Sequence, residues 1–170
     1  MGTLTFSIEQ QDHDQWCWAA VTISVCRFYS DQRSPDQCSL VNQILAPILG
    51  GDDCCQDEAS DNCNIPFSLS DALGTTGHLV QRVQSAVSFA DLTREIDVRG
   101  RPVPIRIVFS DFITRHFIVV VGCVQTPDGK QSVKVADPSL STGNITSIEY
   151  AALLNDYRPG ATWDESYFTS

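Results

Sequence analysis

The segment that most constrains the fold of this chain is residues 16–28, which read WCWAAVTISVCRF. Its first half, residues 16–21, is apolar almost all round, and the apolar residues that follow extend one face. A helix that is apolar on every side has to be buried, so the rest of the chain must pack around it. We expect this central helix to begin near Asp14 or Gln15 and to end near Tyr29.

Capping signals predict three shorter helices. Ser34 lies three residues before Gln37, with a proline at the first helical position, which is the spacing of a capping box. Ser68 and Ser88 are the expected N-caps of two further helices, and the helix after Ser88 is expected to end at Gly100.

From about residue 101 onward the chain favours strands. Residues 116–124 are β-branched and apolar on both faces, which is typical of a central strand. The other expected strands are residues 102–109, 132–136 and 163–169, with a further strand or helix at 148–154. We therefore predict a single α+β domain over residues 1–170. A helical half (about 10–100) would pack against an antiparallel sheet or half-barrel (about 101–170).

The charge of the chain limits its partners. The formal net charge is −10 and the pI is about 4.5, which argues against binding to a phosphate backbone. No stretch is apolar enough to span a membrane, and the first ten residues lack the basic and apolar regions of a secretory signal. We expect a monomer that acts on a polypeptide and binds neither nucleic acid nor membrane. Its compartment stays open, either cytoplasmic or reached by a non-classical secretion route.

The chain contains 7 cysteines, an odd number, so at least one has no partner within the chain. Cys38, Cys54, Cys55 and Cys63 crowd one region, which includes a long irregular loop predicted for residues 47–67. No C-x-x-C motif is present, which argues against a zinc site, and we expect no metal or cofactor. The sequence leaves open whether these four cysteines form disulfides.

Cys17 combines several features of a catalytic nucleophile. A thiol attacks a carbonyl as the thiolate, which a helix N-terminus and a neighbouring histidine both favour. Cys17 lies in the first turn of the predicted central helix, where backbone N–H groups are also available to an oxyanion. Asp12 and Asp14 oppose thiolate formation, so a cationic histidine has to outweigh them. The alternative is that Cys17 is simply a core residue.

His116 is the best candidate base among the 3 histidines, because it begins the most hydrophobic strand and follows a polar stretch. Asp137 ends the next strand and is the expected group that orients the imidazole. A tight turn between these strands would place Asp137 opposite Val120 rather than His116. Either a longer loop or a bulge removes this offset, or another group such as Asn144 orients the histidine.

Gln11 stands six residues before Cys17, close enough for its amide to reach over the helix N-terminus and donate to an oxyanion. Gln10 and Gln15 are rivals for this role. A solvated loop glutamine is the simpler interpretation of Gln11 taken alone.

Together these motifs resemble those of papain-like cysteine peptidases, most closely the bacterial branch of AvrRpt2-type (C70) effectors and their C39-like relatives. WCWAA at the helix start, HFIV at the start of the buried strand and DP after the next strand occur in the order typical of that branch. The resemblance covers residue 10 to the C-terminus and implies a papain-like fold. It makes Cys17 the nucleophile and His116 the general base and then acid. Asp137 would orient the histidine, and Gln11 would be the side-chain donor of the oxyanion hole.

The resemblance implies a thiol protease, a cysteine endopeptidase that works through a thioester intermediate. It also implies a bacterial effector or toxin, for which an immunity or inhibitor protein is a further expected partner. The chain lacks the C-G-S-C-W signature of papain, so the substrate preference of papain does not carry over. Two alternatives stay open, a transglutaminase-like acyltransferase and a non-catalytic protein-binding module on the same fold.

Overall fold

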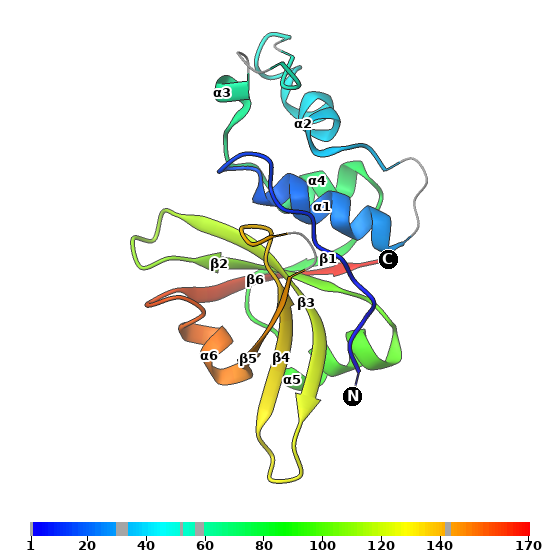
Figure 1. Cartoon of the computed structure of the whole chain (residues 1–170), viewed down its shortest axis with the longest axis vertical. Coiled ribbons are helices and arrows are strands. Elements are labelled where there is room, and N and C mark those ends of the chain that lie inside the picture. Colours follow the sequence, from blue (N-terminus) through cyan, green and yellow to red (C-terminus); the bar gives the residue numbers. More distant parts are fainter. Residues whose placement is uncertain (1, 30–33, 52, 57–59, 142–143) are drawn as a thin grey trace.

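The computed structural model describes residues 2–29, 34–51, 53–56, 60–141 and 144–170 (Figure 1). Its centre is a six-stranded antiparallel sheet. In sheet order the strands are β1 (Leu79–Val83), β6 (Thr162–Thr169), β2 (Val103–Val108), β3 (Arg115–Gln125), β4 (Gln131–Ala136) and β5 (Ile145–Glu149). The prediction of an α+β chain with an antiparallel sheet is confirmed.

Helices lie on both sides of this sheet (Figure 1). On one side are α1 (Cys17–Phe28), α2 (Gln37–Leu45), α3 (Ser60–Cys63) and α4 (Leu69–Thr75). On the other are α5 (Phe89–Thr93), the π-helical turn η1 (Arg94–Val98) and α6 (Tyr150–Asn155). No helix within the described ranges is long and apolar enough to cross a bilayer.

Strand β1 contradicts the prediction that residues 15–100 contain helices and loops alone. It lies at one edge of the sheet, where its neighbour is β6 from the other end of the chain. The three middle residues of β1 are exposed, so its sequence lacks the apolar alternation that marks a half-buried strand. The ambiguous segment 148–154 holds both the end of β5 and most of α6.

Asp36, and not Ser34, is the N-cap of α2, so the predicted cap was wrong. The Asp36 carboxylate accepts a hydrogen bond from the backbone N–H of Ser39 at 2.8 Å. Gln37, expected to complete a capping box, is buried and donates instead to the carbonyl of Gln10 at 2.8 Å. The helix starts two residues later than predicted because an aspartate is as good a cap as a serine.

The other two predicted caps are confirmed. Ser68 accepts from the N–H of Asp71, and Ser88 accepts from the N–H of Asp91. The helical stretch after Ser88 divides into α5 and η1 and is followed by Gly100, whose φ of 64° suits a glycine.

Strand β3 carries core residues on both of its faces. Phe117, Val119 and Val121 belong to the hydrophobic core around α1. Ile118 and Val120 belong to a second core, which includes residues of α5 and α6. This double burial explains why the sequence of the strand is apolar without alternation.

A β-bulge between β3 and β4 moves Asp137 toward the start of β3. The ladder pairs Val120 with Val135 and not with Asp137, because β3 has one extra residue between Val120 and Gly122. Together with the loop between the strands, this bulge shifts the pairing toward His116 by two positions relative to a tight turn. The loop and the bulge together therefore reduce the offset that the sequence left unexplained, and the reach of the two side chains spans the rest.

Candidate active site

Cys17 is the first residue of α1 and is buried, with an exposed fraction of 6%. Both tryptophans that flank it donate hydrogen bonds to one short segment of the chain. The indole N–H of Trp16 donates to the carbonyl of Cys63 at 2.8 Å, and that of Trp18 donates to the carbonyl of Ile65 at 3.2 Å. The two rings therefore fix the start of the helix as well as filling the core.

Two disulfides hold the segment that receives these hydrogen bonds. Cys63 is bonded to Cys54, and Cys55 is bonded to Cys38 in α2. The pairing that the sequence left open thus joins α2, the loop after it and α3. The cysteines outside the disulfides are all buried: Cys17, Cys26 and Cys123.

His116 lies near the start of β3, between Cys17 and Asp137. Its Nε2 atom is 2.6 Å from Oδ1 of Asp137, and the thiol of Cys17 forms a hydrogen bond with the same side chain. Because Nε2 faces Asp137, Nδ1 is the ring nitrogen left for Cys17. Burial by itself lowers the pKa of His116, but the hydrogen bonds with Asp137 and Cys17 outweigh it and raise this pKa to about 9. The imidazolium form is therefore favoured beside the thiol.

Asp137 is fully buried and accepts hydrogen bonds on both carboxylate oxygens. Oδ1 accepts from His116 and from the backbone N–H and hydroxyl of Ser139, at 2.8 and 2.7 Å. Oδ2 accepts from the hydroxyl of Tyr157 at 2.7 Å and from Arg158 at 3.1 Å. Burial would raise the pKa of this carboxyl, but the bond with His116 and those with Tyr157 and Ser139 hold it well below its usual range. Asn144, the alternative orienting group, donates to Ser141 instead.

Gln11 lies close to this site through its backbone, whose N–H donates to the carbonyl of Pro138 at 2.9 Å. Its side-chain amide nitrogen donates to the carbonyls of His13 and Asp14, at 3.0 and 2.8 Å. The amide hydrogens of Gln11 are thus engaged within its own loop. Gln15, one of the rivals, lines the cavity that contains Cys17.

The other two histidines lie apart from this arrangement. His13 packs edge-on against Trp16 at a centroid distance of 4.2 Å. His78 stacks on Tyr29, which follows the last residue of α1 and so lies at the opposite end of the helix from Cys17. His116 is therefore the histidine that the fold brings to Cys17.

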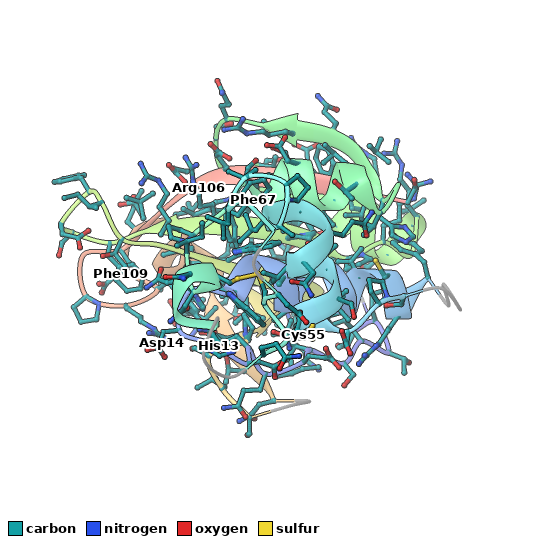
Figure 2. The ribbon with its side chains drawn as sticks, turned by 90° about the horizontal axis from the view of Figure 1, so that it is seen from above. His13, Asp14, Cys55, Phe67, Arg106 and Phe109 are labelled. Carbon is teal, nitrogen blue, oxygen red and sulfur yellow. A yellow bond between two sulfur atoms is a disulfide. The ribbon has the colours of Figure 1, made fainter. Side chains whose placement is uncertain are left out.

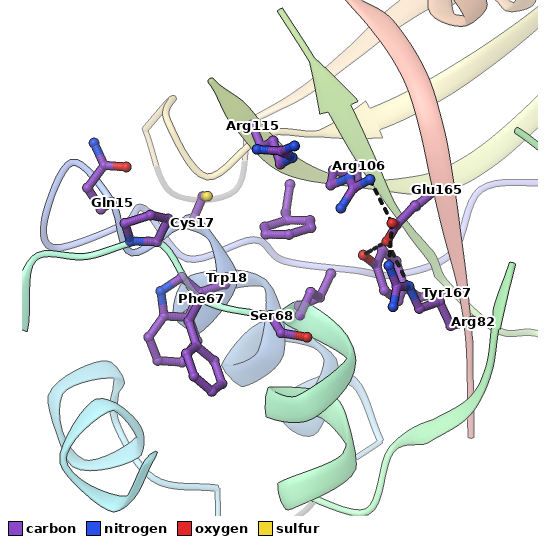
Figure 3. Close-up of a pocket in the computed structure, with 13 residues that line it drawn as sticks. Gln15, Cys17, Trp18, Phe67, Ser68, Arg82, Arg106, Arg115, Glu165 and Tyr167 are labelled. Atoms are coloured by element: carbon purple, nitrogen blue, oxygen red, sulfur yellow. Dashed lines mark hydrogen bonds and ion pairs between the residues drawn. The ribbon is translucent and has the colours of Figure 1, made fainter. Parts of the chain in front are cut away.

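A cavity of about 470 Å³ opens beside Cys17 (Figure 3). Apolar side chains form much of its wall, among them Trp18, Phe67 and Phe117. Figure 2 labels Phe67 and Arg106 in a view from above, and both residues line this cavity. The cavity is the natural place for a substrate group next to the thiol.

The far end of this cavity contains a buried carboxylate that sequence reasoning missed. Glu165 accepts from Nε of Arg82 at 2.9 Å and from Nη2 of Arg106 at 2.6 Å, and the hydroxyl of Tyr167 donates to it at 2.5 Å. Burial raises the pKa of Glu165, but the bond with Arg82 and its other partners lower it overall. The four residues come from β1, β2 and β6, so no local pattern in the sequence could have connected them.

Comparison with known proteins agrees with the arrangement around Cys17. A family model described as papain-like cysteine protease AvrRpt2 matches residues 1–155 of the 170. No curated protein matches the chain. Within the described part of the chain, no three His, Cys, Asp or Glu side chains are grouped so that they could hold a metal ion. The chain belongs to the family of AvrRpt2-type papain-like cysteine proteases and is a cysteine-type peptidase, a hydrolase.

Proposed function

We propose that the chain hydrolyses peptide bonds through a triad of Cys17, His116 and Asp137. The observation that carries this proposal is the position of His116, which contacts Asp137 through Nε2 and forms a hydrogen bond with the Cys17 thiol. A nucleophile, a base and a group that orients the base are the three parts that acyl transfer through a cysteine requires.

In the proposed reaction the thiol proton of Cys17 already resides on Nδ1 of His116, so the pair is a thiolate beside an imidazolium, and the thiolate attacks the carbonyl carbon of the peptide bond. The imidazolium then protonates the leaving amine as the C–N bond breaks, which leaves a thioester on Cys17. His116 next removes a proton from a water molecule that attacks this thioester. The C–S bond breaks, the acid product leaves and the thiol is restored.

Asp137 keeps the imidazole in the tautomer that presents Nδ1 to the thiol and stabilises the positive charge on the ring. Its remaining hydrogen bonds hold the carboxylate in place, because Ser139 and Tyr157 donate to different oxygens. This support is consistent with a carboxylate that stays ionised throughout the reaction.

We propose that the backbone N–H of Cys17 is one donor to the oxyanion and that Gln11 supplies the second. For Gln11 to act, its amide has to exchange the hydrogen bond to Asp14 for one to the substrate. Loss of one such donor lowers the rate on the order of 10²-fold. A fall of this size in Gln11→Ala, and not in Gln15→Ala, would support Gln11; the reverse would assign the role to Gln15.

The decisive experiment compares Cys17→Ala with Cys123→Ala, which removes a buried thiol outside the site. We expect Cys17→Ala to abolish both peptide cleavage and labelling by a thiol-directed electrophile. Cys123→Ala should retain both. Unchanged cleavage by folded Cys17→Ala would refute the proposed nucleophile.

We also propose that the substrate is a polypeptide and that the protein acts as a bacterial effector or toxin, as a monomer. An effector role fits the matched family. If the protein is toxic, an immunity or inhibitor protein is the expected partner. Expression of wild type and Cys17→Ala in a target cell tests the role, because toxicity should depend on the thiol.

A further inference from the structure

The cavity beside Cys17 has a charge opposite in sign to that of the whole chain. Three of the 11 basic residues of the chain line it, Arg82, Arg106 and Arg115, whereas one of the 21 acidic residues, Glu165, does so. The chain as a whole has a formal net charge of −10. This local excess of arginine indicates a preference for a negatively charged or electron-rich group in the cavity.

The carboxylate of Glu165 has little capacity left for a ligand. Arg82 contacts both of its oxygens, Arg106 contacts Oε1, and the hydroxyl of Tyr167 donates to Oε2. Arg106 is also paired with Asp164, through Nε at 2.9 Å and Nη2 at 2.7 Å. The acceptors of this network are therefore occupied by its own donors.

The arginines of the cavity, in contrast, keep N–H donors that no described residue uses. The hydrogen bonds that Arg82 and Arg106 make with described residues run through Nε and Nη2, so the Nη1 group of each retains N–H donors for a ligand. Arg115 donates through Nη1 to the carbonyl of Ile113, and no carboxylate of the described residues forms an ion pair with it. Arg115 thus contributes a positive charge at the cavity that no such pair neutralises.

The cavity is apolar beside Cys17 and basic farther away. In Figure 3, Cys17 lies at one end of the cavity, Arg106 and Glu165 lie at the other, and Arg115 lies between them along one side. The wall near Cys17 includes Trp18 and Phe117 and can contact methylene groups. A short side chain would lie against this apolar wall, whereas a longer one extends toward the arginines.

Resting on the proposed peptidase function, we infer that this cavity is a specificity pocket for an acidic side chain of the substrate. Arg115 is its specificity-determining residue and binds the carboxylate. An apolar side chain would cover the guanidinium of Arg115, which has no carboxylate partner among the described residues, and this is unfavourable. A basic side chain would be repelled. Glutamine would be accepted less well than glutamate, because a neutral acceptor forms the weaker hydrogen bond.

The test uses a peptide library in which each position around the scissile bond is glutamate, glutamine, leucine or lysine. We expect one position at which glutamate exceeds glutamine in kcat/KM on the order of ten-fold, the size of one charge-assisted hydrogen bond. At that position Arg115→Gln should abolish the preference, Arg115→Lys should retain part of it and Arg115→Glu should shift it toward lysine. Arg94→Gln, which removes an exposed arginine outside the cavity, should leave the ratio unchanged.

The outcomes separate this inference from the proposed function. Cleavage that depends on Cys17 but shows no acidic preference at any position would overturn the inference and leave the peptidase mechanism in place. A preference that survives both Arg115→Gln and Arg115→Glu would overturn the role of Arg115. Absence of any cleavage dependent on Cys17 would contradict the proposed function and this inference together.

Discussion

The helical region, which contains Cys17, and the sheet region, which contains His116 and Asp137, position these proposed catalytic groups by different contacts. Cys17 begins a helix packed in the core, and the segment beside it is held by the hydrogen bond from the indole of Trp16 to the carbonyl of Cys63 and by the disulfide from Cys63 to Cys54. His116 and Asp137 lie instead at the ends of adjacent strands in a six-stranded sheet, and alternate residues of β3 pack into the two cores.

This difference predicts which substitutions change the protonation of the catalytic groups and which change their positions. A single hydrogen bond or disulfide can be removed by substitution without altering the rest of the helical region. The position of His116 is set by many ladder hydrogen bonds and contacts, so no single substitution displaces it. Changes near His116 should therefore act through charge and tautomer, whereas changes near Cys17 should act through geometry.

The largest effect should follow from Asp137→Asn, which keeps the shape of the sheet region and removes the charge. An asparagine carries no charge to stabilise the imidazolium, and its NH2 group would face other donors in either orientation, His116 and Ser139 on one side or Tyr157 and Arg158 on the other, so we expect kcat to fall on the order of 10³- to 10⁴-fold. The measurement is kcat on a cleaved peptide, with Asn144→Ala as the control that should retain activity. A folded Asp137→Asn with nearly normal kcat would remove Asp137 from the mechanism.

The disulfides offer the sharpest test on the helical side. Each closes a short loop, with sequence separations of 9 and 17, and its loss should cost roughly 3 kcal/mol of unfolding free energy. Activity should differ more than stability, since Cys63 also accepts the hydrogen bond from Trp16. At temperatures where both double variants are folded, Cys54→Ser with Cys63→Ser should lose more kcat/KM than Cys38→Ser with Cys55→Ser. Equal losses in activity would show that the segment stabilises the fold without positioning Cys17.

The third test concerns the sheet side and uses pH. The pKa of His116 is about 9 in the fold against 6.5 for an ordinary histidine. A raised pKa means that the stabilisation is fully present below pH 6.5 and is lost as the pH rises through about 9. We expect unfolding free energy to fall by an amount on the order of 1–3 kcal/mol across this window. The same measurement on His116→Gln should lack this fall; a variant that retained it would place its origin in another group.

The sequence predicts the candidate site better in some parts than in others. Cys17 and His116 could be identified because each is next to an unusually apolar helix or strand. The bulge that brings Asp137 toward His116 is a property of the ladder, so the sequence could state the offset but not its solution. Ser139 and Tyr157 could not be identified, since their contacts with Asp137 depend on the paths of two loops.

The smallest expected effect is on the stability of α2, where substitutions of Asp36 and Ser34 distinguish the observed N-cap from the predicted one. Asp36 accepts from the N–H of Ser39, whereas the hydroxyl of Ser34 has a contact of 3.4 Å with the adjacent carbonyl of Pro35. Asp36→Ala should therefore lower the unfolding free energy by about 1 kcal/mol, and Ser34→Ala should change it very little. Because α2 carries Cys38 of a disulfide, loss of the cap should also loosen the helical side while leaving the pH dependence of His116 unchanged. Urea unfolding of both variants at pH 6 and pH 9 tests this, and a larger loss in Ser34→Ala would restore the sequence-based cap.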